Sequence, residues 1–307
     1  MASGAEYYGG RSKAVSLTNA DINIRDPFVV PVPAERRYYL YGTRGAETWG
    51  ATKATGLDVY VGTDLENWDG PRLAFDPPAG FWSDRNFWAP EVHAYRGAYY
   101  MFATFKAEGV CRGTQILRAD APVGPFTPHS PRPVTPADRE CLDGTLFVDD
   151  DGAPWMVFCH EWVQITDGAM CAMPLSDDLT SAAGDPVDLF HASDAPWARP
   201  MGKNKDAYVT DGPFLLRADG ALLMLWASHG AAGYAQGVAS SASGNVLGPW
   251  EQVAEPLYAE DGGHGMVFET FDGRLMLTLH KPNGREQERP VFVPLEIGGG
   301  TIRLASE

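Results

Sequence analysis

A hairpin unit occurs five times along this chain of 307 residues, and each copy begins with a polar side chain capable of chemistry. The five starting residues are Asp26, Glu91, Asp143, Asp211 and His264. Their spacings of 65, 52, 68 and 53 residues are too irregular for a short solenoid repeat and fit blades of about four antiparallel strands. The repeat therefore predicts an all-β fold, a five-bladed β-propeller, with these residues directed at one axial cleft.

The turn inside the unit supports this prediction. Three of the units carry a turn glycine nine residues after the start, at Gly152, Gly220 and Gly273, and each glycine follows an aspartate. Asp-Gly between two apolar segments favours a tight hairpin, because glycine readily adopts the positive φ that such turns require. We therefore expect the first two strands of each blade to form a hairpin that starts at the axial cleft.

Composition favours a single domain over residues 1–307. Apolar residues make up 44% of the chain, which is enough to bury a large core, and 34 glycines with 24 prolines match the turn density of many short strands. No low-complexity linker divides the chain, and no stretch has a sustained helical period. The propeller is therefore expected to be one cooperative array.

Charge and hydropathy exclude several classes of partner. A net charge of −16 argues against nucleic acid, which is bound by clustered Lys and Arg. Residues 220–250 lack charged side chains, but polar residues interrupt them too often for a membrane span. The first residues contain no apolar run like that of a signal peptide, which indicates a cytoplasmic protein or the mature form of a secreted one. The oligomeric state is left open.

Motifs for metal, disulfide and serine chemistry are absent from the sequence. The four cysteines form no CxxC pair and are expected to be reduced and buried. His160 and Glu161 are not part of an HExxH motif, and no GxSxG segment is present. Carboxylate chemistry remains.

Asp26, Asp143 and Asp211 should converge at the axial cleft, although they lie far apart in the sequence. Convergent carboxylates repel one another, which raises at least one pKa and lets one carboxyl act as an acid while another stays a base. Cleavage of a glycosidic bond requires such a pair. The alternative is that each aspartate merely forms a turn or caps a strand; their shared position in the repeat favours the chemical role.

Five segments resemble glycoside hydrolase family 43: RDPF, FWAPEVHAYRGAYYMF, LDGTLFVDDDGAPWMVF, DGPFLL and GGHGMVF. The resemblance extends from about Asp21 to Val293. It implies a five-bladed β-propeller that hydrolyses arabinofuranosides or xylosides with inversion of the anomeric carbon. Some relatives in that family act on galactofuranosides. On the matching positions, Asp26 would be the general base, Asp143 would tune and orient the acid, and Asp211 would be the general acid.

The acid position departs from the family pattern, which has glutamate there. Aspartate is one methylene shorter, so the carboxyl of Asp211 would lie roughly 1.5 Å further back. Inverting enzymes tolerate carboxyl separations of about 6.5 to 9.5 Å, so the shortening can be absorbed. Glu161, which follows the second strand of the third unit, is the alternative acid. A non-catalytic or weakly catalytic carbohydrate-binding propeller is the alternative function.

Further residues are expected around the substrate. Glu91 would contact sugar hydroxyls or, alternatively, bond to neighbouring strand amides. The aromatic candidates for stacking on sugar rings would otherwise fill space between blades. Loops at 47–55 and 106–112 are expected at the rim. The expected substrate-binding set is Phe28, Trp88, Glu91, His160, Trp162 and Arg289.

Two of the remaining candidates come from the resemblance. Arg289 resembles a family arginine that reaches the acid-tuning carboxylate, and its alternative is a surface ion pair. His264 resembles an axial histidine that faces a water or a calcium ion, and its alternative is a hydrogen-bonded core histidine. No cofactor is expected to be required, and a structural calcium near the axis is possible. The expected partner is an oligosaccharide.

Overall fold

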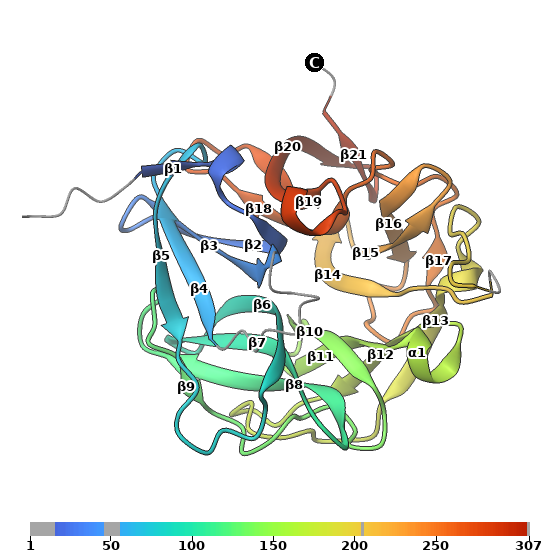
Figure 1. Ribbon diagram of the computed structural model, residues 1–307. Helices are drawn as coiled ribbons and strands as arrows, with labels where there is room; N and C mark the ends of the chain where they lie inside the picture. The colour runs from blue at the N-terminus through green and yellow to red at the C-terminus, as the bar shows by residue number, and fades with distance from the viewer. Residues whose placement is uncertain (1–15, 46–55, 204–205, 306–307) are drawn as a thin grey trace, which may run out of the picture.

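The computed structural model describes residues 16–45, 56–203 and 206–305, and its strands form five antiparallel sheets around a central axis (Figure 1). This arrangement confirms the prediction of an all-β, five-bladed propeller. The one α-helix described, α1 (Trp162–Ile165), is a single turn, and no helix of the described residues is long and apolar enough to span a membrane.

Each blade has four strands in sequence order from the axis outward, and the first blade gains a fifth strand from the N-terminal side. The first blade contains β2 (Ile24–Val32), β3 (Arg37–Arg44), β4 (Leu57–Gly62), β5 (Asn67–Phe75) and β1 (Ser16–Thr18), and the second contains β6 (Arg85–Tyr95), β7 (Ala98–Ala107), β8 (Val110–Ala119) and β9 (Thr127–Pro128). The third blade contains β10 (Cys141–Val148), β11 (Pro154–His160), β12 (Ala169–Pro174) and β13 (Val187–His191), and the fourth contains β14 (Asp211–Ala218), β15 (Ala221–Gly230), β16 (Gly233–Ser241) and β17 (Glu251–Gln252). The fifth blade contains β18 (Gly263–Glu269), β19 (Leu275–Lys281), β20 (Arg289–Gly298) and β21 (Thr301–Leu304).

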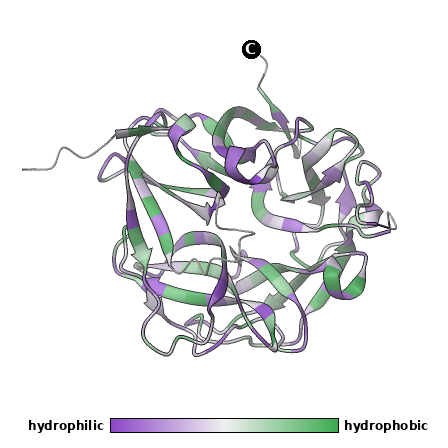
Figure 2. Ribbon diagram, viewed as in Figure 1, coloured by the Kyte–Doolittle hydropathy of each residue, from purple (hydrophilic) through white to green (hydrophobic). Residues whose placement is uncertain are grey.

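The inner hairpins form where the Asp-Gly turns predict them. Gly220 has φ 87° between β14 and β15, a conformation that a side chain would strain. Hydrophobic residues are carried by the strands (Figure 2) and pack between neighbouring blades. For example, Phe75 of the first blade contacts Phe87 and Phe105 of the second, with ring centroids 6.3 and 6.0 Å away. Burial of such aromatic pairs stabilises the packing of neighbouring blades against each other.

A bulge interrupts every inner strand at the same place. The pairing register shifts there in β2, β6, β10, β14 and β18, and one residue within each shift has a positive φ between 43° and 55°. These five bulge residues are Asp26, Ala89, Asp143, Gly212 and His264. Bulges re-aim side chains and are common beside active sites. The repeat therefore places equivalent side chains at one level of the axis.

The bulges correct the alignment of the repeat predicted from the sequence. Glu91 lies two residues after the bulge residue of its blade, which is Ala89, and Asp211 lies one residue before its own, which is Gly212. Asp211 thus belongs to a second equivalent set, the pre-bulge residues, which are Arg25, Trp88, Leu142, Asp211 and Gly263. The Asp-Gly pattern predicts the position of the turn between two strands, but it does not show at which residue the bulge lies.

The ring closes where the first and last blades meet, and the two lie side by side in Figure 1. The backbone N–H of Ile24 donates to the carbonyl of Glu288 at 3.3 Å, and the Asn23 amide donates to the carbonyl of Arg285 at 2.9 Å. Arg25 forms a buried ion pair with Glu288. We call these contacts the closing seam.

Candidate active site

A cavity of about 430 Å³ opens at one end of the axis. Its wall contains bulge or pre-bulge residues from all five inner strands, together with side chains from β8, β15, β16 and α1. The residues that carry its chemistry are Arg25, Asp26, Trp88, Arg112, Asp143, Glu161, Trp162, Asp211, Tyr234 and His264. The cleft that the sequence predicts at the axis is therefore present.

Asp26 is buried and held from both sides. Its Oδ2 accepts a hydrogen bond from the Thr43 hydroxyl at 2.7 Å, and its Oδ1 lies 3.1 Å from His264 Nδ1 and 3.8 Å from Arg25 Nε. Burial alone would raise the pKa of this carboxyl, but the positive charges of His264 and Arg25 outweigh burial and hold the pKa well below its usual value. Asp26 is therefore ionised and suited to accept a proton.

His264 lies between two of the aspartates. Its Nδ1 is 3.1 Å from Asp26 Oδ1 and 3.7 Å from Asp143 Oδ2. Burial lowers the pKa of the imidazole, but the charges of Asp26 and Asp143 act against it and raise the pKa to about 10. The ring is therefore a cation at neutral pH. Gly212 packs against it, and a Cβ at that bulge position would lie 2.5 Å from the His264 ring.

The same geometry bears on the predicted calcium. Calcium prefers six to eight oxygen ligands, whereas a protonated imidazole donates hydrogen bonds and cannot bind a metal. Over residues 16–45, 56–203 and 206–305, no group of three or more His, Cys, Asp and Glu side chains is arranged to hold a metal ion. The residues around His264 do not fit a calcium ion.

His280 is a second buried histidine beside Asp26, but it is neutral. Burial and the charge of Arg25 lower the pKa of His280 to about 3. Its Nδ1 accepts a hydrogen bond from the backbone N–H of Asp26 at 3.3 Å, and its Nε2 lies 3.3 Å from the Asn283 side-chain oxygen. A neutral ring with its proton on Nε2 satisfies both contacts, so His280 fixes the bulge backbone without adding charge.

Asp143 is buried opposite Asp26. The backbone N–H of Gly212 donates to its Oδ2 at 3.0 Å, and its own N–H donates to the Thr104 hydroxyl at 2.9 Å. Burial raises the pKa of Asp143, the charge of His264 lowers it, and the charges of Asp211 and Asp26 raise it, so that it lies at about 7. Asp143 therefore gains and loses its proton near neutral pH.

Asp211 points into the cavity from the pre-bulge position of β14. Its Oδ2 accepts a hydrogen bond from the hydroxyl of Tyr234 at 2.7 Å. Burial raises the pKa of Asp211 above its usual value, against the opposing influence of His264, Tyr234 and Arg25. The cavity thus joins a carboxylate with a lowered pKa, Asp26, to a carboxyl with a raised pKa, Asp211.

Glu161, the alternative acid, lies on the same cavity wall with a different partner. Its carboxylate forms an ion pair with the guanidinium of Arg112, which also lies 4.7 Å from the centroid of the Trp88 ring. The backbone N–H of Arg112 donates to Glu140, which pairs with Lys106. A close arginine favours the ionised form of a carboxyl.

Several residues predicted from the sequence come together in this cavity, and four do not. Trp88, Glu161, Trp162, the three aspartates and His264 all line it. His160 is turned away and bonds to Gln164 at 2.8 Å. Arg289 donates to the backbone oxygens of Ala20, Glu286 and Glu288 and does not line the cavity.

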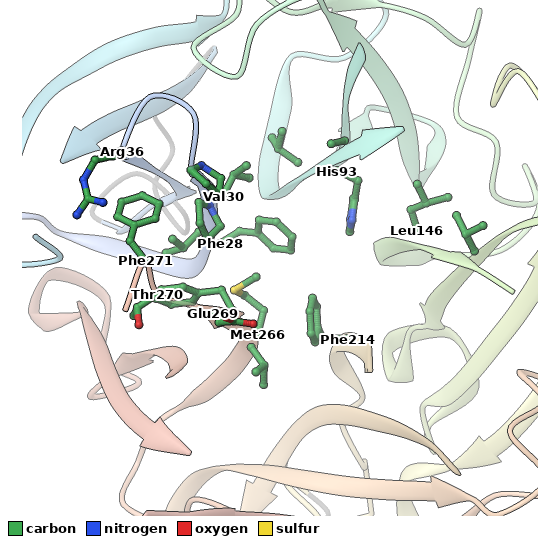
Figure 3. Close-up of a pocket in the computed structure, with 18 residues that line it drawn as sticks. Phe28, Val30, Arg36, His93, Leu146, Phe214, Met266, Glu269, Thr270 and Phe271 are labelled. Atoms are coloured by element: carbon green, nitrogen blue, oxygen red, sulfur yellow. The ribbon is translucent and has the colours of Figure 1, made fainter. Parts of the chain in front are cut away.

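Phe28 and Glu91 lie further along the inner strands. Phe28 lines a second cavity of about 730 Å³, where its ring lies 5.2 Å from His93 and 6.2 Å from Phe214 (Figure 3). Glu91 is buried, with its Oε2 3.3 Å from His93 Nε2, and it lines neither cavity. A strand rises about 3.3 Å per residue, so residues beyond the bulge lie away from the end of the axis where the first cavity opens.

Four residues of the site were not predicted from the sequence: Arg25, Arg112, Tyr234 and His280. Arg25 precedes Asp26 in the RDPF segment, so its position next to a predicted base was an available signal. Arg112 falls in the rim loop predicted at 106–112, whereas the loop at 47–55 lies outside the described residues. Tyr234 and His280 lie on later strands, where the sequence offers no sign of contact.

Three of the four cysteines, Cys141, Cys159 and Cys171, are buried, and Cys111 is partly buried. All four are free thiols within the described residues, which agrees with the expectation of reduced cysteines.

Comparison with known proteins gives a consistent relationship. The family model described as Glycosyl hydrolases family 43 matches residues 21–293. The crystal structure of an endo-arabinase from Bacteroides thetaiotaomicron is 42% identical, with a TM-score of 0.85, and the match covers 93% of this chain and 98% of that one.

Two curated enzymes match over shorter segments. An extracellular endo-alpha-(1->5)-L-arabinanase 1 from Bacillus subtilis is 26% identical over 161 residues, which is 48% of this chain and 48% of that enzyme. A xylosidase/arabinosidase 43A from Humicola insolens is 37% identical over 82 residues, which is 26% of this chain and 24% of that enzyme. The matches span about half of the first enzyme and a quarter of the second.

Proposed function

Since this chain belongs to glycosyl hydrolase family 43, we propose that it hydrolyses α-L-arabinofuranosyl linkages in plant-type oligosaccharides and polysaccharides, with inversion at the anomeric carbon. Arabinofuranosyl linkages are favoured over β-xylosyl ones because the endo-arabinase is 42% identical over nearly the whole chain. The arabinanase from Bacillus subtilis supports the same choice.

The observation that carries the proposal is the division of pKa values between carboxyls on one cavity wall. His264 and Arg25 hold the pKa of Asp26 low, whereas burial raises the pKa of Asp211. One group is thus ionised and the other retains its proton more strongly, as an acid–base pair requires. Asp143 lines the same cavity, with a pKa near 7 and a hydrogen bond from the backbone N–H of Gly212.

In the proposed reaction, Asp26 takes a proton from a water molecule whose oxygen forms a bond to the anomeric carbon. The bond from that carbon to the glycosidic oxygen breaks, and the leaving oxygen receives the proton of Asp211. Asp143 and Asp211 repel each other when both are charged, which disfavours the loss of both protons. His264 stabilises the negative charge of Asp26 before the reaction, and its proton stays on the imidazole.

Two tryptophans and a cation supply contacts for the sugar. Trp88 and Trp162 line the cavity, and Arg112 stacks on Trp88 while it pairs with Glu161. Aromatic faces bind the apolar faces of sugars, and the charged pair offers hydrogen bonds to hydroxyl groups. Because the carboxylate of Glu161 is already paired with the guanidinium of Arg112, we assign the acid to Asp211 and a binding role to Glu161.

This assignment predicts different results for two substitutions. Asp211→Asn should lower the release of reducing sugar from arabino-oligosaccharides by about 100-fold, since general acid catalysis is lost. Glu161→Gln should raise KM several-fold and leave kcat within about threefold, because a binding contact changes KM. A loss of kcat in Glu161→Gln with full activity in Asp211→Asn would exchange the two roles.

Aspartate in the acid position also motivates a second function, a propeller that binds sugars without hydrolysing them. A panel of arabino-oligosaccharides, xylo-oligosaccharides and aryl furanosides separates the two functions. Release of sugar from the arabinose substrates supports the hydrolase. Binding detected by calorimetry, without release from any member of the panel, would support the second function.

A further inference from the structure

Tyr234 reaches Asp211 from β16, two strands away in the same blade, and is held on several sides. Its ring stacks on His280 with centroids 5.4 Å apart and planes at 24°, and it meets His229 edge-on at 5.7 Å. Its backbone N–H donates to Asp261 at 3.1 Å. The side chain is almost wholly buried, so its hydroxyl has one fixed direction, toward Asp211 Oδ2 at 2.7 Å.

Gly263 provides the space for this ring. It is the pre-bulge residue of the fifth blade, equivalent to Arg25, Trp88, Leu142 and Asp211 in the other four. A Cβ at Gly263 would lie 2.8 Å from two carbon atoms of the Tyr234 ring, closer than side-chain carbons normally approach. Tyr234 therefore occupies the place of the pre-bulge side chain that the fifth blade lacks.

We propose that Tyr234 is a positioning residue for the general acid: its hydroxyl holds Asp211 Oδ2 and leaves Oδ1 to carry the proton that the leaving group receives. The inference rests on the proposed function. It also bears on the short acid, because a carboxyl with one methylene fewer than glutamate has a shorter reach and benefits from a fixed direction.

The hydrogen bond also acts on the charge that the reaction creates. When Asp211 gives up its proton, the Tyr234 hydroxyl already donates to the carboxylate that forms, and a hydrogen bond to an ion is stronger than one between neutral groups. Burial and the nearby Asp211 raise the pKa of Tyr234 well above its usual value, so the phenol remains a donor. The other charged or titratable groups around Asp211 include Arg25, Asp26, Arg112, Asp143, Cys159 and His264.

Tyr234→Phe should reduce kcat in proportion to how much the leaving group needs a proton. We expect a loss of about 10- to 100-fold on arabino-oligosaccharides and less than about threefold on para-nitrophenyl arabinofuranoside, with phenyl arabinofuranoside in between. The basic limb of the kcat profile should move to higher pH, because the hydrogen bond that lowers the pKa of Asp211 is gone. Equal losses on all three substrates, or no loss, would overturn the proposal.

Tyr41→Phe is the matched control. Tyr41 is fully buried in the first blade, and its hydroxyl donates to the carbonyl of Pro122, so this variant also removes one buried hydrogen bond. Its kcat should be the same as that of the wild type on every substrate. Thermal unfolding of both variants shows whether each remains folded at the assay temperature.

Gly263→Ala tests the same geometry without removing the hydroxyl. The added methyl group should displace the Tyr234 ring and produce the same dependence on leaving group. If Tyr234→Phe fails to fold, this variant still decides the question: a loss that is larger for the poorer leaving group supports the proposal, and a uniform loss contradicts it.

A comparison in the Asp211→Asn background separates this proposal from the proposed function. There the Tyr234 substitution should change kcat by less than about twofold, because the acid is already absent. If Asp211→Asn itself has full activity on arabino-oligosaccharides, the assignment of the acid is wrong. If Asp211→Asn is impaired but Tyr234→Phe is not, only the role of Tyr234 is wrong.

Discussion

Asp26→Asn should abolish hydrolysis, with kcat on arabino-oligosaccharides lower by about 10⁴-fold, at the upper end of what a general base contributes. Asparagine preserves the size of the side chain and its hydrogen bond from Thr43, but it cannot accept a proton from water. The measurement is the initial rate of reducing-sugar release at pH 7. Binding of arabino-oligosaccharides, followed by calorimetry, should persist within about tenfold.

Asp58→Asn is a matched control for this result. Asp58 lies in the same blade on β4, forms an ion pair with Arg44 at 2.7 Å, and does not line the cavity. It should retain the kcat of the wild type. If Asp26→Asn keeps more than a tenth of the wild-type rate, Asp26 is not the base, and the proposed mechanism is wrong even if the enzyme proves to be a hydrolase.

His264→Gln should have the second largest effect, because it removes the cation that faces Asp26 and Asp143. Without this charge the pKa of Asp26 rises, so the acidic limb of the activity profile should move to higher pH. We expect kcat at pH 7 to fall by about 10³-fold, since the base is weakened and the carboxylates repel one another.

The effect of this variant on stability should depend on pH in a defined direction. The pKa of His264 is about 10 in the folded protein, above 6.5 for an ordinary histidine, so the folded state binds the proton more tightly. The resulting stabilisation is fully present below pH 6.5 and is lost as the pH rises through about 10. At pH 6 the free energy of unfolding of the wild type should therefore exceed that of His264→Gln by about 3 kcal/mol or more, because breaking a buried ion pair leaves charges unpaired.

Denaturant unfolding at pH 6, 8 and 10 measures this dependence. His129→Gln is the control: His129 bonds to the carbonyl of Asp178 and has no carboxylate partner among the residues that the structure describes. The difference in free energy of unfolding between His129→Gln and the wild type should not decrease in the same way from pH 6 to 10. A His264→Gln difference that stays constant from pH 6 to 10 would show that the imidazole is uncharged in the folded protein.

The sequence predicts the blades well because their signals are local. The Asp-Gly turns at Gly152, Gly220 and Gly273 mark where the first strand of an inner hairpin ends and the second begins. The conformation of such a turn depends mainly on the residues within it. The repeat alone predicts that Asp26, Asp143 and His264 lie at the axis, and all three line one cavity.

The parts that the sequence could not predict depend on register or on contacts between blades. The bulge makes Ala89 and Gly212 the equivalents of Asp26, and a shift of one residue changes the direction of a side chain. Phe28 lies two residues beyond the bulge of its own strand, so it lines the second cavity rather than the one that holds Asp26. Arg289 was expected near the acid-tuning carboxylate, but it binds backbone oxygens, and Tyr234 depends on a space at Gly263 in another blade.

The closing seam implies an order of events during synthesis. Asp26 is made early, whereas His280, which holds its backbone, follows 254 residues later, and Glu288, the partner of Arg25, later still. At 5 to 20 residues per second, a ribosome needs roughly 13 to 50 s to cover that distance. A nascent chain that stops before the fifth blade therefore carries all three aspartates but lacks the histidines that set their charges. Under the proposed mechanism, catalytic activity consequently reports that translation has passed the fifth blade and that this blade has met the first.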